Sequence, residues 1–349
     1  MALIIQKFGG TSLADENGRE RLAGKVMQAL DHGDQPVLVV SAIGRRGAPY
    51  ATDTLLDILL DFDPKPDRMI SDLLVSSGET ISACLIATLL RQHGIQAVPL
   101  TAYTAGILGQ GPFGDAVPVG VDSAAILAHL GQGMTPVITG FQAKDPSNNI
   151  ITLGRGGSDT SAMAIGAGLL ADFVDIYTDV PGVAKADPRV VQDVEYMEFL
   201  DYGSMFRLAR CGAKVLQDRS AKLAENSGLL VRVRSTFDDG EGTLIGPAGT
   251  RDKRGRPRTH SDFIGLAWLP DPDGSLMVTA VFAKGKGKVG NAVAMAAAQP
   301  FQVVQNQLDD PDAVSFRCEP ERLPGFAKCL YAGLEQFFSA KAIPAGKSS

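Results

Sequence analysis

Gln6-Lys7-Phe8-Gly9-Gly10-Thr11-Ser12 closes the first apolar run of the chain, Leu3-Ile4-Ile5, and places a lysine beside a glycine pair. The run predicts a strand, and the glycines predict a sharp turn into a helix. Because glycines admit an anion close to the backbone and a helix start offers N–H groups, Lys7, Gly9 and Gly10 are candidates for binding a nucleotide phosphate. The spacings of a Walker loop and of a dinucleotide fingerprint are both absent. An ordinary strand-to-helix turn with a surface lysine remains the alternative.

Short β-branched runs alternate with longer helical patterns over the first two thirds of the chain. The expected strands are Leu3–Phe8, 37–41, Ala97–Leu100, 136–139, 175–178 and 231–234. The expected helices are 16–30, 72–93, 122–130 and 158–170. This alternation predicts an α/β fold with a mainly parallel central sheet and helices on both faces. The glycine- and proline-rich stretch 106–118 predicts a loop or irregular hairpin over a site.

The composition changes after residue 247, which suggests a second domain. We expect a first domain over 1–247, a polar linker over 248–261 and a small α+β domain over 262–349. The last part predicts strands at 276–282, 301–307 and 313–318 and helices at 290–298 and 324–338. The order β-α-β-β-α is that of a ferredoxin-like module. The basic cluster 251–258 reads as a solvated linker rather than a binding patch.

Bulk properties exclude several classes of function. The 349 residues carry a formal net charge of −6, which argues against nucleic acid as a partner. No run of 18 or more apolar residues and no basic-then-apolar leader is present, so we expect no membrane partner and a cytoplasmic protein. The four cysteines and four histidines are scattered without ligand spacing, which indicates neither a disulfide framework nor a metal site in the chain itself.

Two motifs carry a resemblance to a known family. The opening segment resembles the K-F-G-G-T-S of aspartate kinases, and the stretch from Thr152 to Ala162 resembles their T-x-G-R-G-G-S-D-x-[ST]-A. The resemblance covers roughly residues 1–247. It implies the three-layer amino acid kinase fold, and a reaction in which ATP phosphorylates L-aspartate to 4-phospho-L-aspartate in amino-acid biosynthesis. A weaker resemblance to ACT-domain motifs is found in Val304-Gln305-Asn306 and Val314-Ser315-Phe316. It implies that the C-terminal part is a shortened, ACT-like domain for regulation or dimerisation.

A kinase that acts on a carboxylate needs no general base, because its nucleophile is already ionised at neutral pH. It must instead bring two anions together, so cations and aligned amides are the expected equipment. Lys7 is therefore a candidate catalytic residue that neutralises the transferring phosphoryl group, and the resemblance adds Asp159 as a second one. The resemblance implies that Asp159 organises lysines and the metal–nucleotide complex. By itself, an aspartate there could simply cap the helix that follows.

The resemblance also implies an amino acid site. Arg155, between glycines, would clamp the α-carboxylate, although a surface arginine in a flexible loop is the alternative. Glu79, in a match to S-x-G-E, would bind the α-amino group. Thr52, Phe141 and Ser158 match further substrate-binding positions, while a threonine as a helix cap and a phenylalanine as core filler are common.

Nucleotide contacts are implied by three further matches. Thr178 and Asp179 lie in wording similar to W-T-D-V-x-G-V, Arg189 lies in A-D-P-R, and Lys214 lies in G-A-K-V-L. Magnesium would arrive with ATP, held mainly by phosphate oxygens and water. A single module at the end could pair across a homodimer or higher homo-oligomer through exposed edge strands.

Several positions depart from the family wording. Ala184 stands where a tyrosine is common, Gln217-Asp218 replaces H-P, and Arg207 stands where a glutamate is usual. These departures, with the short end, keep two alternatives open. One is a non-catalytic regulatory family member, and the other is a kinase of another small amino acid in a specialised pathway.

Overall fold

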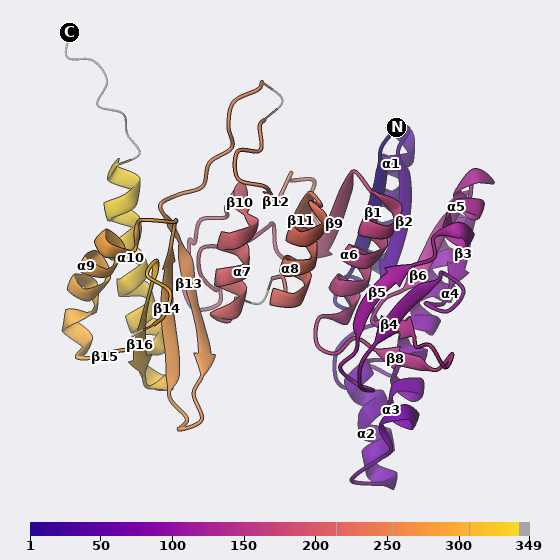
Figure 1. Cartoon of the computed structure of the whole chain (residues 1–349), viewed down its shortest axis with the longest axis horizontal. Helices are drawn as coiled ribbons and strands as arrows, with labels where there is room; N and C mark the ends of the chain where they lie inside the picture. The colour runs from indigo at the N-terminus through magenta and orange to yellow at the C-terminus, as the bar shows by residue number, and fades with distance from the viewer. Residues whose placement is uncertain (214, 253, 307, 342–349) are drawn as a thin grey trace. The chain divides into compact units, whose positions relative to one another are not determined.

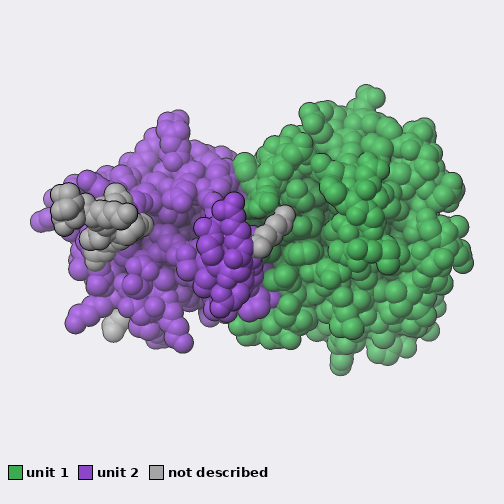
Figure 2. Space-filling model, turned by 90° about the horizontal axis from the view of Figure 1, so that it is seen from above, with its two compact units in different colours: residues 1–181, 222–244 green, residues 182–221, 245–349 purple. Residues whose placement is uncertain are grey.

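The computed structural model describes residues 1–213, 215–252, 254–306 and 308–341. The chain forms two compact units, which Figure 2 shows in different colours. The first comprises residues 1–181 and 222–244, and the second comprises residues 182–221 and 245–349. Lys214, a predicted nucleotide contact, lies outside the described residues.

A mainly parallel sheet forms the centre of the first unit (Figure 1). From β12 to the edge strand β3, this eight-stranded sheet has the order β12 (Thr243–Gly246), β11 (Val231–Ser235), β9 (Phe173–Thr178), β1 (Leu3–Phe8), β2 (Gln35–Val40), β6 (Thr135–Thr139) and β3 (Ala97–Leu100). From β11 to β3 every neighbouring pair is parallel. The apolar runs of β1, β2 and β6 are almost wholly buried, as expected for strands covered on both faces. The α/β prediction is confirmed.

Helices cover the two faces of this sheet. Helices α1 (Glu16–Asp31) and α4 (Ser77–Gln92) pack on one face, where Phe8 of β1 joins a core with Leu22 and Ile86. Helix α6 (Gly157–Leu169) lies on the other face, because a side chain at Gly166 would meet Val174 and Ile5. Since successive strand residues point to opposite faces, the orientation of Phe8 and Ile5 places Lys7 on the α6 side. Helix α5 (Ala124–Gly131) contacts β6.

Helices α3 (Arg68–Val75) and α4 follow each other almost without interruption, and α2 (Thr52–Phe62) packs beside α3 (Figure 1). The combined stretch Arg68–Gln92 is long and apolar enough to cross a membrane by length and composition alone. Half of its most apolar window is buried, and it carries the buried carboxylates Asp72 and Glu79. Its burial and its buried carboxylates indicate a helix that packs in the core of the first unit.

A second, small sheet in the first unit has the order β5-β4-β7-β8. Strands β4 (Ile107–Gln110) and β5 (Val117–Val121) pair antiparallel with an irregularity, so the stretch 106–118 is a hairpin, as expected. Strands β7 (Gln142–Lys144) and β8 (Ile150–Thr152) form a second hairpin, in which Gln142 faces Thr152. The polypeptide leaving β8 runs directly into Gly154, Arg155 and the start of α6.

The second unit contains an antiparallel sheet of order β13-β14-β16-β15, with bounds Phe263–Pro270, Leu276–Phe282, Ala313–Cys318 and Val304–Asn306. Helices α9 (Gly287–Ala298) and α10 (Leu323–Lys341) share a core with its strands through Phe282, Phe316 and Phe326. Helix α7 (Tyr202–Arg210) contacts β13 and β14. Strand β10 (Phe199–Asp201) precedes α7, and α8 (Asp218–Ser227) leads back to the first unit.

The order of this C-terminal sheet differs from the expectation in one strand. We predicted β-α-β-β-α beginning at Leu276, whereas β13 precedes it and pairs antiparallel with β14 at the sheet edge. The arrangement is compatible with an ACT-like module. The compact units also divide the chain differently from the predicted domains 1–247 and 262–349, because residues 182–221 group with the C-terminal part. The functional division into catalytic and regulatory domains stays a prediction.

Candidate active site

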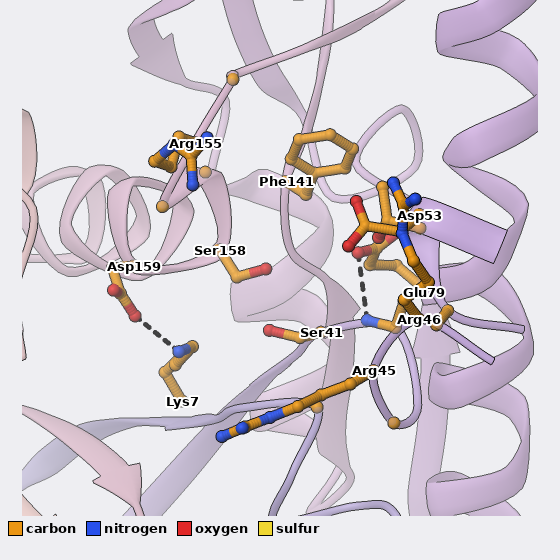
Figure 3. A pocket seen from close by; sticks show the side chains of 18 residues that line it. Lys7, Ser41, Arg45, Arg46, Asp53, Glu79, Phe141, Arg155, Ser158 and Asp159 are labelled. Atoms are coloured by element: carbon orange, nitrogen blue, oxygen red, sulfur yellow. Dashed lines mark hydrogen bonds and ion pairs between the residues drawn. The ribbon is translucent and has the colours of Figure 1, made fainter. Parts of the chain in front are cut away.

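A cavity of about 640 Å³ opens within the first unit, beyond the ends of β1, β2 and β6. Ligands commonly bind at this edge of an open α/β sheet. Four cationic and three acidic side chains line it, and Figure 3 shows how they lie. The lining residues are Lys7, Gly10, Ser41, Ala42, Gly44, Arg45, Arg46, Ala51, Thr52, Asp53, Glu79, Phe141, Gly154, Arg155, Gly156, Gly157, Ser158 and Asp159. Eight of the predicted site residues are among them.

Lys7 and Asp159 form an ion pair at the cavity wall. The lysine Nζ lies 2.6 Å from the aspartate Oδ1, and each side chain is only about one tenth exposed (Figure 3). Asp159 lies in the first turn of α6, but that helix has no side-chain cap, so the aspartate does not act as a capping residue. The pair places a cation at the end of β1, held by an acid on α6.

Helix α6 begins inside the cavity. Its first residues, Gly157 and Ser158, line the wall, and its N-cap is Gly156 with φ +70°. A helix N-terminus carries partial positive charge and N–H donors, both of which favour a phosphate or a carboxylate. Lys7 and this helix start therefore present positive potential to one region of the cavity.

The turn after β1 leads to helix α1, which begins at Glu16 as predicted. The Asp15 carboxylate caps this helix by accepting a hydrogen bond from the Gly18 N–H. Gly10 lines the cavity, while Gly9 lies beside Lys7, because a Cβ at Gly9 would be 3.7 Å from the lysine Nζ.

Gly10→Ala should impair the site through its backbone contacts. A Cβ at residue 10 would lie 2.4 Å from the Ala42 carbonyl oxygen and 2.7 Å from that of Gly44, and the Gly44 N–H donates to the Gly10 oxygen. The loop after β2 must move, so we expect unfolding free energy to fall by about 1–3 kcal/mol. Chemical denaturation checks this, with Gly24→Ala as the control, since Gly24 has open space around it. Equal stability of both variants would contradict the close approach.

Glu79, in the first turn of α4, is the most deeply buried acid of the cavity. It is 2% exposed, and its Oε1 accepts a hydrogen bond from Ala42 N at 3.0 Å. Its Oε2 has no hydrogen-bond partner within the described part of the chain. Burial raises the pKa of this carboxyl to about 8, since the charged form loses its hydration. An ammonium group would supply the missing partner.

Arg155 projects from the segment between β8 and α6. Gly154 (φ +69°) and Gly156 (φ +70°) flank it, a conformation that residues with a Cβ rarely adopt. Arg155 is exposed, lines the cavity and has no hydrogen-bond or ion-pair partner among the described residues. Its guanidinium is therefore available for paired hydrogen bonds with a carboxylate. In Figure 3, Phe141 and Ser158 are drawn between Arg155 and Glu79.

The three further predicted substrate residues also line the cavity. Thr52 is the first residue of α2, whose N-cap is Ala51 without a side-chain cap bond, so Thr52 does not cap the helix. Phe141 is partly exposed and has φ +68°, and its ring packs against Gly157 rather than filling the core. Ser158 packs against Gly140, where a Cβ would lie 2.8 Å from the serine side chain.

Of the predicted nucleotide contacts, Lys7 and Gly10 line the cavity, whereas Thr178, Asp179 and Arg189 do not. Thr178 ends β9, beside β1, and its hydroxyl donates to Asp179 at 3.2 Å. The Asp179 carboxylate lies 3.5 Å from Arg45, which does line the cavity. Arg189 belongs to the second unit and binds Asp187. The nucleotide assignments stay predictions.

Ser41, Arg45, Arg46 and Asp53 line the cavity and were not predicted from the sequence. The arginines lie in the loop after β2, where neither helical nor strand periodicity marks a residue. The available signal was their place directly after Gly44, in the turn that follows a predicted strand. With Arg45 and Arg46 the cavity has four cationic side chains, which suits the binding of two anionic substrates.

The departures from family wording have structural roles in the second unit. Arg207 donates to the Phe282 carbonyl at 2.7 Å and lies 3.6 Å from Asp310, so it ties α7 to the C-terminal sheet. Ala184 forms an isolated bridge with Tyr196 and packs against the C-terminal core. Asp218 begins α8, and its carboxylate accepts from the Arg219 N–H.

The described ranges contain no group of three or more His, Cys, Asp or Glu side chains that could hold a metal ion without other ligands. A metal that accompanies a nucleotide needs fewer protein ligands, because phosphate oxygens and water complete its shell. Asp159, beside Lys7, is the cavity acid nearest to the proposed phosphate region. The cavity therefore fits a metal bound with a nucleotide.

Residues 2–235 match the amino acid kinase family, and the chain belongs to that family. Aspartokinase 1 of Bacillus subtilis (strain 168) is 40% identical over 245 residues, which are 70% of this chain and 61% of that protein. The aspartokinase of Mycolicibacterium smegmatis is 37% identical over 246 residues, 70% of this chain and 57% of that protein. The chain thus spans about three fifths of the length of the curated relatives it matches.

Two solved aspartokinase structures also resemble this chain. The structure of Escherichia coli aspartokinase III with aspartate and ADP matches with a TM-score of 0.75 at 21% identity, over 95% of this chain and 99% of that one. The aspartate kinase of Synechocystis matches with a TM-score of 0.62 at 30% identity, over 97% of this chain and 56% of that one. The first likeness supports the fold alone.

Proposed function

We propose that this protein is a kinase that transfers the γ-phosphoryl group of ATP to the side-chain carboxylate of L-aspartate, giving 4-phospho-L-aspartate and ADP. The observation that carries the proposal is a single cavity that combines the Lys7–Asp159 pair and the α6 start with Arg155 and the unpartnered Glu79 oxygen. The first group suits a phosphoryl group, and the second suits an amino acid. The similarity to named aspartokinases supports the same acceptor.

Each residue then has a defined task. Arg155 binds the α-carboxylate, Glu79 binds the α-ammonium group, and Thr52, Phe141 and Ser158 shape the space between them. An oxygen of the ionised side-chain carboxylate attacks the γ-phosphorus, the bond to the ADP oxygen breaks, and the negative charge moves to ADP. Lys7 neutralises charge on the transferring group, and Asp159 holds Lys7 in place. No residue needs to remove a proton from the acceptor.

Finer parts of the proposal concern the nucleotide and the assembly. We propose that Mg²⁺ binds with ATP, and that Thr178, Asp179, Arg189 and Lys214 contact the nucleotide. We also propose a cytoplasmic homodimer or higher homo-oligomer that serves amino-acid biosynthesis, including that of lysine. Its ACT-like sheet would pair through the edge strand β15, where Val304 is 65% exposed.

A hydroxylamine assay tests the acceptor. Purified protein is incubated with Mg-ATP, hydroxylamine and one amino or carboxylic acid at a time, because acyl phosphates are trapped as hydroxamates. We expect product with L-aspartate, and far less with L-glutamate, succinate or β-alanine, each of which changes the chain length or removes one α-group. Product with another acid alone would indicate a kinase of that acid. Nucleotide binding without any product would indicate a non-catalytic family member.

A further inference from the structure

Asp72 is a buried carboxylate that the proposed chemistry does not use. It lies in α3, is 3% exposed and is not a cavity-lining residue. Its Oδ2 accepts hydrogen bonds from Thr152 N at 2.7 Å and from Gly114 N at 2.9 Å, and its Oδ1 accepts one from Thr152 Oγ1 at 2.9 Å. Within the described ranges it has no cationic partner, so these three bonds satisfy its buried oxygen atoms.

A second contact joins the residue that follows α3 to the same hairpin, one helical turn after Asp72. The Ser76 carbonyl, four residues after Asp72, accepts a 2.6 Å hydrogen bond from Gln142 Nε2. Gln142 and Thr152 are paired opposite each other in the β7–β8 hairpin. Gln142 is itself held, because its Oε1 accepts from Thr139 Oγ1 at 3.2 Å. Asp72 on α3 and Ser76, the residue between α3 and α4, thus bind two partnered positions of one hairpin, which fixes both the position and the rotation of the helix.

Both ends of this connection lead into the amino acid site. On the hairpin, Gln142 directly follows Phe141, and Thr152 precedes Arg155 by three residues. On the helical side, the chain continues from Ser76 into α4, where Glu79 occupies the first turn. The bond to Gly114 also holds the 111–116 turn against Gly154, where a Cβ would lie 2.9 Å from Asp115 Oδ1.

We propose that Asp72 is a positioning residue, which sets the separation between Arg155 and Glu79 and thereby selects an acceptor with an ammonium and a carboxylate group on one carbon. The inference rests on the proposed function, because that function assigns the two α-groups to Arg155 and Glu79. Displacement of one group by about 1 Å weakens a two-point contact severely. The phosphate region uses Lys7 and α6 instead, and none of the three hydrogen bonds of Asp72 goes to either of them.

The test measures steady-state kinetics of Asp72→Ala and Asp72→Asn with L-aspartate and with ATP varied separately. In Asp72→Ala we expect the KM for L-aspartate to rise about tenfold, with kcat and the KM for ATP within about twofold of wild type. Asparagine can accept the two backbone bonds with its amide oxygen and donate its amide N–H to the Thr152 hydroxyl. Asp72→Asn should therefore restore the aspartate KM to within about threefold of wild type.

Asp145→Ala is the matched control. Asp145 lies at the turn of the same hairpin and accepts two bonds from Asn149 at 2.7 and 2.9 Å, without contacting α3. This variant should leave both KM values unchanged. A folded Asp72→Ala with an unchanged aspartate KM, or with equal losses for aspartate and ATP, would overturn the positioning role.

If Asp72→Ala does not fold, Thr152→Val decides the question, because it removes only the Oγ1 bond. Its aspartate KM should rise about threefold with the ATP KM unchanged, and an unchanged aspartate KM would refute the inference. Wild-type protein that shows no aspartate-dependent turnover would refute the proposed function instead, so the two failures are distinguishable.

Discussion

Lys7→Met should reduce kcat for phosphoryl transfer by about 10³-fold, because it removes the cation that faces the transferring group in a water-poor site. Lys7 is one tenth exposed and lies 2.6 Å from Asp159, so its charge is held where no surface lysine can replace it. The hydroxamate assay with L-aspartate gives the rate. The aspartate KM should change little, since the amino acid contacts are made by Arg155 and Glu79.

Stability must be measured beside activity, because the substitution leaves Asp159 without its cation. We expect Lys7→Met/Asp159→Asn to fold as well as Lys7→Met alone and to remain inactive. Lys144→Met is the control cation, since Lys144 lies over the Tyr103 ring outside the cavity lining. A folded Lys7→Met that retained more than about a tenth of wild-type turnover would exclude the proposed catalytic role.

Glu79→Gln should weaken L-aspartate binding about 100-fold at pH 8.5, where the wild-type carboxyl is mostly ionised. Burial raises the pKa of Glu79 to about 8, so at pH 7 the unliganded protein holds this carboxyl mainly neutral. An ammonium group needs the charged form, and binding below pH 8 must therefore release a proton. Wild-type affinity should rise about tenfold from pH 6.5 to 7.5 and level off above pH 8, whereas Glu79→Gln should show no such rise.

Calorimetry in buffers of different ionisation enthalpy measures the released proton directly. Glu20→Gln, at a half-exposed acid of α1, is the control and should keep the wild-type profile.

The Glu79 carboxyl also affects the stability of the fold. Its native pKa lies above its unfolded value of 4.5, so its contribution is present below pH 4.5 and is lost as pH rises through 8. The effect of Glu79 on binding is separated from its effect on stability by the affinity measurement. If the affinity of the wild-type protein for L-aspartate did not change with pH, the assigned role of Glu79 would be contradicted whatever the stability shows.

The sequence predicts those elements whose pattern is local. Leu3–Phe8 and Leu276–Phe282 begin and end as predicted, because they contain β-branched residues and turn residues lie beside them. Helix α2 was not predicted as an element, since only Leu55 of its residues is buried and its apolar residues do not form one buried stripe. Strand β13 was missed because its place at the sheet edge is defined by pairing with β14, which follows it in the chain.

The site shows the same limit. Lys7 and Asp159 are 152 positions apart, and they meet because β1 lies beside β9 with α6 packed on that face. Their matches to two family motifs, rather than any local pattern, assigned both residues to one site. Asp72 could not be recognised, because within a helical pattern it resembles an ordinary helix-start acid, and the predicted helix began at it. Its partners Gly114 and Thr152 are 42 and 80 residues away.

Oxygen transfer from the acceptor to phosphate tests the central claim most directly. The protein is incubated with ATP, Mg²⁺, hydroxylamine and L-aspartate labelled with ¹⁸O in its side-chain carboxylate. Attack of that carboxylate on the γ-phosphorus leaves a labelled oxygen bridging carbon and phosphorus, and hydroxylamine then expels it with the phosphate. We predict one ¹⁸O atom in each phosphate released with hydroxamate, measured by mass spectrometry. Phosphate without label would mean that water, and not the aspartate carboxylate, receives the phosphoryl group.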